Sequence, residues 1–397
     1  MKPDNSLILT VNAGSSSIKF AVFDARAPVR HTLRGAISRI GFPDARLEVA
    51  GTAAGSNVSR SVKAPDYTLA AEVLMQWVEA SVDRAALSAV GHRLVHGGPN
   101  YSEPQLITPT LVEELRRLSP FDPEHLPREI RLVESFARRF PGLLQVACFD
   151  TAFHRNIPTV ARLLPIPRRY EAQGIRRYGF HGLSYSYLMQ ALAELPETGA
   201  ARGRIILAHL GNGASLAAVR DGRPVDTSMS FTPAGGLPMS TRSGDLDPGL
   251  FAYLASTQGL KVEDFNQMVN LESGLLGISE TSSDIRDLLA CEAQDARAAE
   301  AIALFCYQVR KWIGGFAAAL GGLDTLVFSG GIGENAPLIR ERICAELGFL
   351  GIELDPDRNG RGAALVSRDS GRVKVRVIQT DEALTIAHAV AHFVSPV

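Results

Sequence analysis

Short stretches that are almost entirely apolar recur along the chain, and each is followed at once by glycine or polar residues. Runs of this length, bounded in this way, are typical of buried β-strands that end in a loop. Five of them predict strands at residues 7–11, 143–149, 204–210, 325–328 and 373–378. The residues that follow are Asn12, Asp150, a Gly-Asn-Gly loop at 211–213, a glycine-rich loop at 329–333 and the segment 380–382.

Other segments carry apolar residues at three- and four-residue spacing, which indicates one buried face of a helix. The clearest lie at residues 111–118, 130–140, 299–320 and 383–393. Strands mixed with helices along the whole chain predict an α/β fold with functional residues at the strand ends. A chain of 397 residues is too long for one ordinary core, so two domains are expected.

A weak internal repeat bears on the domain organisation. Residues 12–24 and 209–221 share the order apolar strand, small-residue turn, apolar strand, and at an offset of 197 residues they match at Gly14 and Gly211, Ala21 and Ala218, Val22 and Val219, and Asp24 and Asp221. Chance similarity between two strand pairs is one interpretation of these matches. The other is a duplicated domain, with a boundary near residues 150–200.

Three glycine-rich loops, each at the end of a predicted strand, indicate contact with phosphate. They lie at residues 12–17, where serines fill the turn, at 209–213 and at 329–333. Small residues let backbone N–H groups approach phosphate oxygens, and Lys19 could add a cation. Each loop alone is more often an ordinary turn, but three together favour a nucleotide. Neither the P-loop pattern nor a dinucleotide-binding pattern is present, so NAD is not expected.

Composition and charge exclude several classes of function. The chain is 46% hydrophobic and 21% charged, as expected for a soluble globular protein, and 41 basic against 42 acidic residues leave a net charge of −1. No basic excess points to nucleic acid or to a membrane surface. There is no signal-peptide pattern or membrane-spanning run, and the four cysteines lack the spacing of a zinc site or a disulfide framework. We therefore expect a cytoplasmic protein.

Nine ordered motifs between residues 7 and 388 carry a resemblance to a known family. The motifs are NAGSSSIKF (12–20), HRLVHGG (92–98), FDTAFH (149–154), RRYGFHGLS (176–184), HLGNG (209–213), STRSGDLDPG (240–249), SSDIRDL (282–288), GGIGENA (330–336) and TDEALTIA (380–387). In these motifs the chain resembles the acetate kinases, which belong to the actin and sugar-kinase superfamily.

The resemblance implies an α/β fold of two duplicated actin-like (ribonuclease H-like) domains with an active-site cleft between them. The acyl-substrate domain would comprise residues 1–151 and about 385–397. Residues 152–384 would form the nucleotide domain, through which family members commonly form homodimers.

A kinase that phosphorylates a carboxylate has little need of a base, because its acceptor is already an anion at neutral pH. It needs cations that bring an anion and a polyphosphate together. By resemblance, Arg93 and Arg242 bind the substrate carboxylate and the transferring phosphoryl, His181 stabilises the transition state, and Asp150 orients an arginine or metal-bound water. From the residues alone, solvated loop arginines, a structural histidine and a turn aspartate are the ordinary alternatives.

The resemblance also assigns the remaining site residues. Mg²⁺, which Mn²⁺ could replace, would lie at Asn12 and Glu382, and the acyl methyl would face Val95, Phe121, Phe180 and Pro233. ATP or ADP would contact Lys19, His209, Leu210, Gly211, Asn212, Gly213, Asp284, Ile285, Arg286, Gly331, Ile332, Gly333, Glu334 and Asn335.

This chain departs from the family pattern at four places. Asp122 stands where relatives usually carry histidine, with His125 three residues on, and the added negative charge could lower activity. Phe121 replaces a smaller leucine, which would shorten the acyl pocket and favour acetate. Ile285 stands where relatives have an aromatic residue or methionine. Ala383 follows Glu382 where relatives often have a second glutamate, so Glu382 is the clearer metal candidate.

The leading hypothesis is a reversible, Mg²⁺-dependent acetate kinase that converts acetate and ATP to acetyl phosphate and ADP. A propionate or butyrate kinase is the alternative with the same chemistry. An actin-fold ATPase, or a binding-only paralogue with weakened kinase activity, is the alternative from another class.

Overall fold

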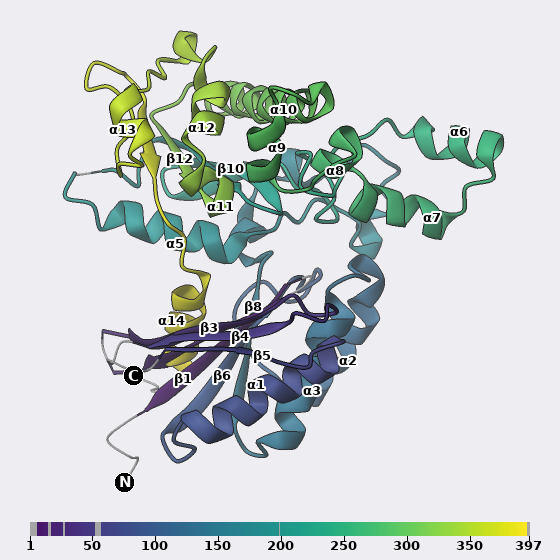
Figure 1. Cartoon of the computed structure of the whole chain (residues 1–397), viewed down its shortest axis with the longest axis vertical. Coiled ribbons are helices and arrows are strands. Elements are labelled where there is room, and N and C mark those ends of the chain that lie inside the picture. The colour runs from purple at the N-terminus through teal and green to yellow at the C-terminus, as the bar shows by residue number, and fades with distance from the viewer. Residues whose placement is uncertain (1–5, 15–16, 27, 52–56, 198, 395–397) are drawn as a thin grey trace. The chain divides into compact units, whose positions relative to one another are not determined.

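The computed structural model describes residues 6–14, 17–26, 28–51, 57–197 and 199–394 (Figure 1), so Ser15 and Ser16 of the first predicted phosphate loop lie outside the described residues. The chain forms two compact units, one up to Ala152 with the return segment from Asp381, and one from Phe153 to Thr380. The return begins at Asp381 and not near 385, because α14 (Glu382–Val394) packs as one helix on strands of the first unit.

The first unit is built on an eight-stranded sheet with helices on both faces. Its strand order is β5-β4-β3-β2-β1-β6-β8-β7. The strands are β1 (Leu7–Ala13), β2 (Ile18–Asp24), β3 (Arg30–Ser38), β4 (Arg46–Gly51), β5 (Val58–Ser61), β6 (Leu87–Leu94), β7 (Gln105–Leu106) and β8 (Leu144–Phe149). Besides α14, the helices are α1 (Tyr67–Ser81), α2 (Pro109–Leu118) and α3 (Leu126–Arg139).

Alternating side chains of these strands feed two apolar layers. Leu9 and Val11 belong to the core that includes Trp77 of α1 and Phe136 of α3. The opposite face of the sheet lies against α14, whose Ile386 and Val390 are fully buried. Both faces of β1 are therefore covered, which is why its sequence is nearly continuous in apolar residues.

The second unit repeats this plan with a smaller sheet and more helices. Its five strands run in the order β11-β10-β9-β12-β13. They are β9 (Arg204–Leu210), β10 (Ala214–Arg220), β11 (Arg223–Thr227), β12 (Thr325–Ser329) and β13 (Lys374–Val377). The helices are α4 (Thr159–Arg162), α5 (Gly182–Ala193), α6 (Gly249–Gln258), α7 (Val262–Gln267), α8 (Gly274–Ser279), α9 (Ile285–Cys291), α10 (Ala296–Leu320), α11 (Gly330–Asn335), α12 (Pro337–Cys344) and α13 (Pro356–Gly360).

The topology shows that the two units are duplicated. In the first unit β3, β2 and β1 pair antiparallel, and β1, β6 and β8 continue in parallel. In the second unit β11, β10 and β9 pair antiparallel, and β9, β12 and β13 continue in parallel. The internal repeat is therefore the first hairpin of each domain, and the α/β prediction with two duplicated domains is confirmed.

One local prediction was wrong. The loop predicted at 329–333 is largely the short helix α11. Gly330 makes this turn possible: its φ is +76°, and a Cβ there would lie 2.6 Å from the carbonyl oxygen of Leu210. Pro337 opens α12, a helix position that proline favours.

No helix among the described residues is both long enough and apolar enough to cross a membrane.

We predict that Gly91→Ala destabilises the first unit by about 1–3 kcal/mol, the usual cost of overpacking. Gly91 lies in β6 beneath α14, and a Cβ there would come within 2.4 Å of Ile386 Cγ2 and 2.6 Å of Val390 Cγ2. These are methyls of β-branched, fully buried side chains that cannot turn away. Urea denaturation measures the effect.

The matched control is Gly315→Ala in α10, where nothing lies within 4 Å of the added Cβ. Because alanine is the better helix former, this variant should gain up to about 1 kcal/mol. Adding Val390→Ala to Gly91→Ala should cost less than the two changes separately. Strict additivity would mean that the methyl contact is not the cause.

Candidate active site

Three neighbouring parallel strands of the first unit end at the same edge of the sheet, and each supplies a polar residue there. Asn12 lies near the end of β1, Arg93 near the end of β6, and Asp150 directly after β8. In open α/β sheets, ligands bind at the carboxyl ends of the strands. The topology thus gathers three residues that are 81 and 57 positions apart in the sequence.

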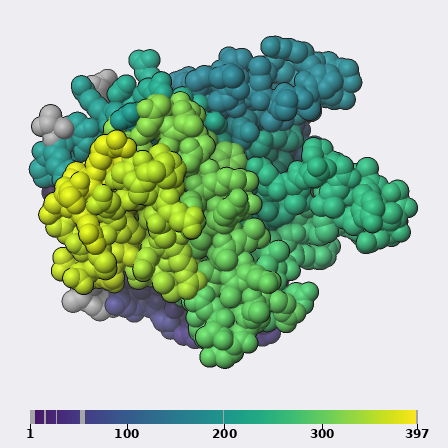
Figure 2. Space-filling view, turned by 90° about the horizontal axis from the view of Figure 1, so that it is seen from above, coloured from purple at the N-terminus to yellow at the C-terminus, as the bar shows by residue number. Residues whose placement is uncertain are grey.

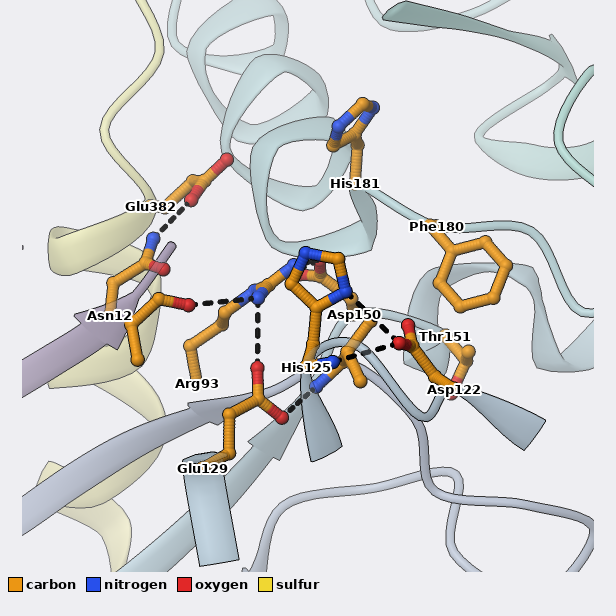
Figure 3. Close-up of polar contacts among 12 residues, drawn as sticks. Asn12, Arg93, Asp122, His125, Glu129, Asp150, Thr151, Phe180, His181 and Glu382 are labelled. Atoms are coloured by element: carbon orange, nitrogen blue, oxygen red, sulfur yellow. Dashed lines mark hydrogen bonds and ion pairs between the residues drawn. The ribbon is translucent and has the colours of Figure 1, made fainter. Parts of the chain in front are cut away.

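Arg93 is held by two buried carboxylates. Its Nη2 and Nε donate to Asp150 Oδ2 at 2.6 and 3.1 Å, and its Nη1 donates to Glu129 Oε1 at 2.9 Å and to the carbonyl oxygen of Ala13 at 3.3 Å (Figure 3). The Arg93 side chain is 14% exposed, whereas both carboxylates are 2% exposed. Four hydrogen bonds therefore fix the plane of the guanidinium, while part of the side chain stays accessible to solvent.

Glu129 was not predicted from the sequence, yet it is central to this cluster. Its second oxygen accepts the backbone N–H of Val95 at 2.8 Å, so it joins the Arg93 strand to helix α3. A signal was available: α3 buries Leu126, Ile130 and Val133, and Glu129 interrupts that apolar face. A charged residue on a buried helical face usually has a partner.

The cluster carries an excess of negative charge. Burial, reinforced by the carboxylates of Asp122 and Asp150, raises the pKa of Glu129 to about 8 against the opposing effect of Arg93. Burial and the nearby Asp150 also raise the pKa of Glu382. Although burial alone would lower it, Asp150 and Glu129 raise the pKa of Arg93 above its ordinary value. Arg93 therefore stays charged, and Glu129 takes up a proton more readily than an ordinary glutamate.

The predicted metal residues come together in this cluster. Asn12 Nδ2 donates to Glu382 Oε2 at 2.7 Å, which leaves the amide oxygen of Asn12 available as a ligand (Figure 3). Asp150 Oδ1 is buried and has no hydrogen-bond partner among the described residues. No cluster of three His, Cys, Asp or Glu side chains suited to a metal occurs among those residues. A few oxygen ligands completed by water suit Mg²⁺, so the residues present fit that ion.

Lys19 lies on β2 opposite Asn12 in the antiparallel register and is exposed. Its positive charge opposes the rise in the pKa of Glu382. The first hairpin therefore brings one cation to the acidic edge of the sheet.

Asp122, which departs from the family pattern, is a buried residue that orients His125. Its Oδ1 accepts the backbone N–H of His125 at 3.0 Å and lies 3.0 Å from Nδ1 of the same residue (Figure 3). His125 and Glu129 are one helical turn apart at the start of α3. The substitution thus places an Asp–His pair beside the Arg93 cluster.

The four residues predicted to line the acyl pocket fall in both units. Val95 is buried after β6, and half-buried Phe121 packs its ring edge against His96 at 5.5 Å between centroids. Phe180 is buried and Pro233 half-buried in the second unit. A shared pocket of these four side chains remains a prediction.

In the second unit, His181 and Arg242 converge on Gly213. A Cβ added to Gly213 would lie 3.1 Å from His181 Nε2 and 3.6 Å from Arg242 Nη1, so a side chain here would crowd His181. Asn212 also accepts the backbone N–H of Ser240 at 3.2 Å, which ties the Arg242 segment to the same loop. Two predicted catalytic groups and one predicted phosphate loop are therefore neighbours.

The other residues predicted to contact the nucleotide lie in two regions of the second unit, around α11 and at the start of α9. His209 to Gly213 meet α11, because a Cβ at Gly211 would lie 3.7 Å from the amide nitrogen of Gly331. Glu334 Oε1 accepts the N–H groups of Gly330 at 2.8 Å and Thr380 at 3.2 Å, so this side chain stabilises the loop.

Residues 284–286 open helix α9. Asp284 accepts the N–H of Arg286 at 2.8 Å, and the guanidinium of Arg286 lowers the pKa of Asp284. Ile285 is only 4% exposed, so its side chain packs inward. Its contact with adenine remains a prediction.

A family model described as the acetokinase family matches residues 7–388. The chain belongs to the acetokinase family. Among its family relatives, a protein named acetate kinase from Rhodopseudomonas palustris (strain TIE-1) is 42% identical over 391 residues, covering 97% of this chain and 98% of its own length.

Solved structures of the family have the same fold. A propionate kinase from Francisella tularensis gives a TM-score of 0.89 at 35% identity, with 97% of this chain and 98% of that chain covered. An acetate kinase from Porphyromonas gingivalis gives 0.85 at 35% identity, with 96% and 98% covered. Family membership and the actin-like fold are thus confirmed, and the chain is a phosphotransferase.

We predict that stability falls as the pH rises from about 6.5 to 8, and that Glu129→Gln flattens this dependence. The folded state keeps the Glu129 proton up to a pH of about 8, whereas the unfolded chain loses it near 4.5. Stabilisation by that proton is therefore full at low pH and disappears as the pH approaches 8. His92 and His154, whose pKa values burial lowers to about 4, are neutral in the folded state, whereas the unfolded chain loses their protons around pH 6.5. They reduce the fall at the lower end of this range, and the comparison with Glu129→Gln cancels their contribution.

Chemical denaturation at closely spaced pH values tests this. The slopes of the two proteins should differ by at most about 1.4 kcal/mol per pH unit, the value for one proton. Parallel curves would show that Glu129 is ionised in both states.

Proposed function

We propose that this member of the acetokinase family transfers the γ-phosphoryl group of ATP to the carboxylate of acetate, reversibly, giving acetyl phosphate and ADP. A carboxylate oxygen forms the new bond to phosphorus while the bond from phosphorus to the bridging oxygen of ADP breaks. The electron pair leaves on ADP, and no proton needs to move. The observation that carries the proposal is Arg93, a guanidinium oriented by Asp150 and Glu129 at the carboxyl ends of three parallel strands.

On the acyl side, Arg93 counters the repulsion between the two anionic reactants. The solvent-accessible part of the Arg93 guanidinium binds an oxygen of the acetate or of the phosphoryl group. The carboxylates of Asp150 and Glu129 fix the orientation of the guanidinium. Because the guanidinium is oriented before substrates bind, little reorganisation is needed during transfer. Asp150 acts as an orienting group in this scheme and not as a base.

On the nucleotide side, His181 and Arg242 stabilise the charge on the phosphoryl oxygens. Both groups face the Gly213 loop, whose backbone can approach phosphate because it lacks a side chain. Asn12, Glu382 and Asp150 would hold Mg²⁺, with Mn²⁺ as a possible replacement. When bound, that ion neutralises phosphate charge and orients the polyphosphate.

Propionate is the second candidate acceptor, since one close structural relative is named a propionate kinase. The larger Phe121 favours acetate, although one methylene is worth only about 1–3 kcal/mol of discrimination. A coupled kinase assay with acetate, propionate and butyrate decides between them by kcat/KM.

We predict that Arg93→Ala and Arg242→Ala each lower kcat by about 10²- to 10³-fold, the loss expected for one preorganised donor. ATP binding, measured by calorimetry, should change much less. Arg93→Lys should not restore activity, because a single ammonium group cannot bridge Asp150 and Glu129 as the planar guanidinium does.

The control is Arg342→Ala, which removes another bidentate pair, with Glu292 at 2.7 and 2.8 Å, outside the proposed site. Its kcat should stay within about twofold of the unmodified protein. Near-normal turnover in both active-site variants would refute the assignment. Absence of acetyl phosphate from the unmodified protein would instead favour an actin-fold ATPase or a binding-only relative.

We also propose that two copies of the chain associate through the segment containing α6 and α7. Neither helix has a buried residue, and Tyr253, Val262 and Leu271 are 63%, 65% and 51% exposed. This segment projects from the rest of its unit in the ribbon and space-filling views (Figures 1 and 2). An apolar arm that covers no core of its own is typical of a subunit interface.

We predict that the double variant Tyr253→Asp with Val262→Asp is a monomer in sedimentation velocity at concentrations where the unmodified protein is a dimer. Val160→Asp, at an apolar position that is 86% exposed outside the arm, should leave the dimer intact. A dimer in the double variant would place the interface elsewhere.

A further inference from the structure

His181 is held in a conformation that its own backbone disfavours. It precedes α5 with φ of +57°, in the left-handed region that only a few per cent of non-glycine residues occupy. Phe180 immediately precedes His181 in the sequence. Its carbonyl oxygen lies 3.0 Å from Nε2 of the buried His154. Such strain persists only where the surroundings fix the residue, and it is concentrated at functional sites.

A chain of two buried hydroxyls ends on the imidazole of His181. His181 Nδ1 lies 2.8 Å from Ser215 Oγ, and Ser215 Oγ lies 2.5 Å from the hydroxyl of Tyr185. Ser215 and Tyr185 are both 0% exposed. Ser215 comes from β10, and Tyr185 lies one turn into α5, where its N–H donates to the carbonyl of His181. We name this chain the Tyr185–Ser215 relay.

The other ring nitrogen of His181 faces the reaction side. Nε2 is the atom that would lie 3.1 Å from a Cβ at Gly213, beside Arg242 Nη1. If the relay determines which nitrogen carries the proton, it also determines whether Nε2 donates to a phosphoryl oxygen or repels it.

Donor strength sets the direction of the relay. The phenol is the stronger acid of the two hydroxyls, so Tyr185 donates to Ser215 Oγ. The serine proton then points to its remaining neighbour, Nδ1 of His181. With Nδ1 accepting, the proton of the neutral imidazole lies on Nε2.

A second relay supports His209, whose ring stacks on His181 at 4.2 Å between centroids. His209 Nδ1 lies 2.9 Å from Ser184 Oγ, which lies 2.8 Å from Thr380 Oγ1. In both His181 and His209, the ring nitrogen Nδ1 is thus held by a serine hydroxyl. Only the relay on His181 contains a phenol, and so only that one has a direction set by acidity.

We propose that Ser215 and Tyr185 are positioning residues that keep His181 as the neutral tautomer with its proton on Nε2, ready to donate to the transferring phosphoryl group. This inference rests on the proposed function, in which His181 stabilises that group. It adds two residues that touch no substrate and act through the imidazole.

The test measures kcat and KM of Ser215→Ala and Tyr185→Phe between pH 5.5 and 8.5. Without the serine proton, Nδ1 and Nε2 compete for the single proton of the neutral ring, and part of the donor population is lost. At pH 8, we expect kcat to fall about 10-fold or more in Ser215→Ala and several-fold in Tyr185→Phe, with KM for acetate changed less than about twofold.

The pH profile distinguishes positioning from damage. A protonated imidazole carries a proton on both nitrogens, so the deficit of Ser215→Ala should shrink as the pH falls. The charged or titratable groups that the described contacts place near the ring include His209 on β9, Arg242 on the 239–243 loop and Tyr185 on α5. His209 and Arg242 are unchanged in Ser215→Ala, so the difference from the unmodified protein reports His181.

Ser228→Ala is the matched control, because Ser228 is equally buried and accepts the N–H of Leu216, next to Ser215, at 2.9 Å. Its kcat should remain within about twofold at every pH. A pH-independent loss in Ser215→Ala, an equal loss in Ser228→Ala, or no loss in either relay variant would overturn the relay. If His181→Ala itself kept near-normal turnover, the proposed function would fail instead.

Discussion

The bond between the Arg93 guanidinium and the carboxylates of Asp150 and Glu129 is the interaction on which the first unit's site depends. It needs β6 and β8 side by side and parallel, so that Arg93 and Asp150 end at one edge. It also needs α3 packed against that sheet, so that Glu129 reaches both Arg93 and the N–H of Val95. Breaking one of these contacts would leave a buried charge without its partner, which is far more costly than losing an exposed pair.

This arrangement also has an electrostatic consequence. Asp122, Glu129, Asp150 and Glu382 influence one another through a poorly solvated region, and the carboxyls of Glu129 and Glu382 respond with raised pKa values. Such a cluster is unfavourable without cations and becomes favourable when a cation and an oriented guanidinium share its charge. Under the proposed function, a site that binds two anions is thus prepared by carboxylates that orient the positive groups.

Much of the fold could be predicted from the sequence, because long apolar runs and helical periodicity reflect burial directly. The strand at 204–210 and the helix predicted at 383–393, which begins at Glu382 in the structure, were predicted in this way. The repeat was visible only weakly, because four positions separate β1 from β2 and three separate β9 from β10. An alignment without a gap therefore puts the second strand of each pair out of register by one residue.

The site was predictable only where a residue type stands in a motif. Arg93, Asp150 and His181 were identified by resemblance to the acetate kinases. Glu129 and the proposed positioning residues Ser215 and Tyr185 were missed, because their contacts link separate elements. The pairing of Asp122 with His125 likewise depends on how the turn before α3 closes. Residues that position others leave little local signal in a single sequence.

The most direct test of the central claim is a crystal structure with ADP, Mg²⁺, acetate and aluminium fluoride, a planar mimic of the transferring phosphoryl group. The account predicts that the solvent-accessible part of the Arg93 guanidinium lies within hydrogen-bond distance of the fluoride or acetate oxygen while Nη2 keeps its bond to Asp150 and Nη1 its bond to Glu129. A guanidinium that stays on its carboxylates without touching either ligand, or one that leaves both carboxylates to bind them, would contradict it.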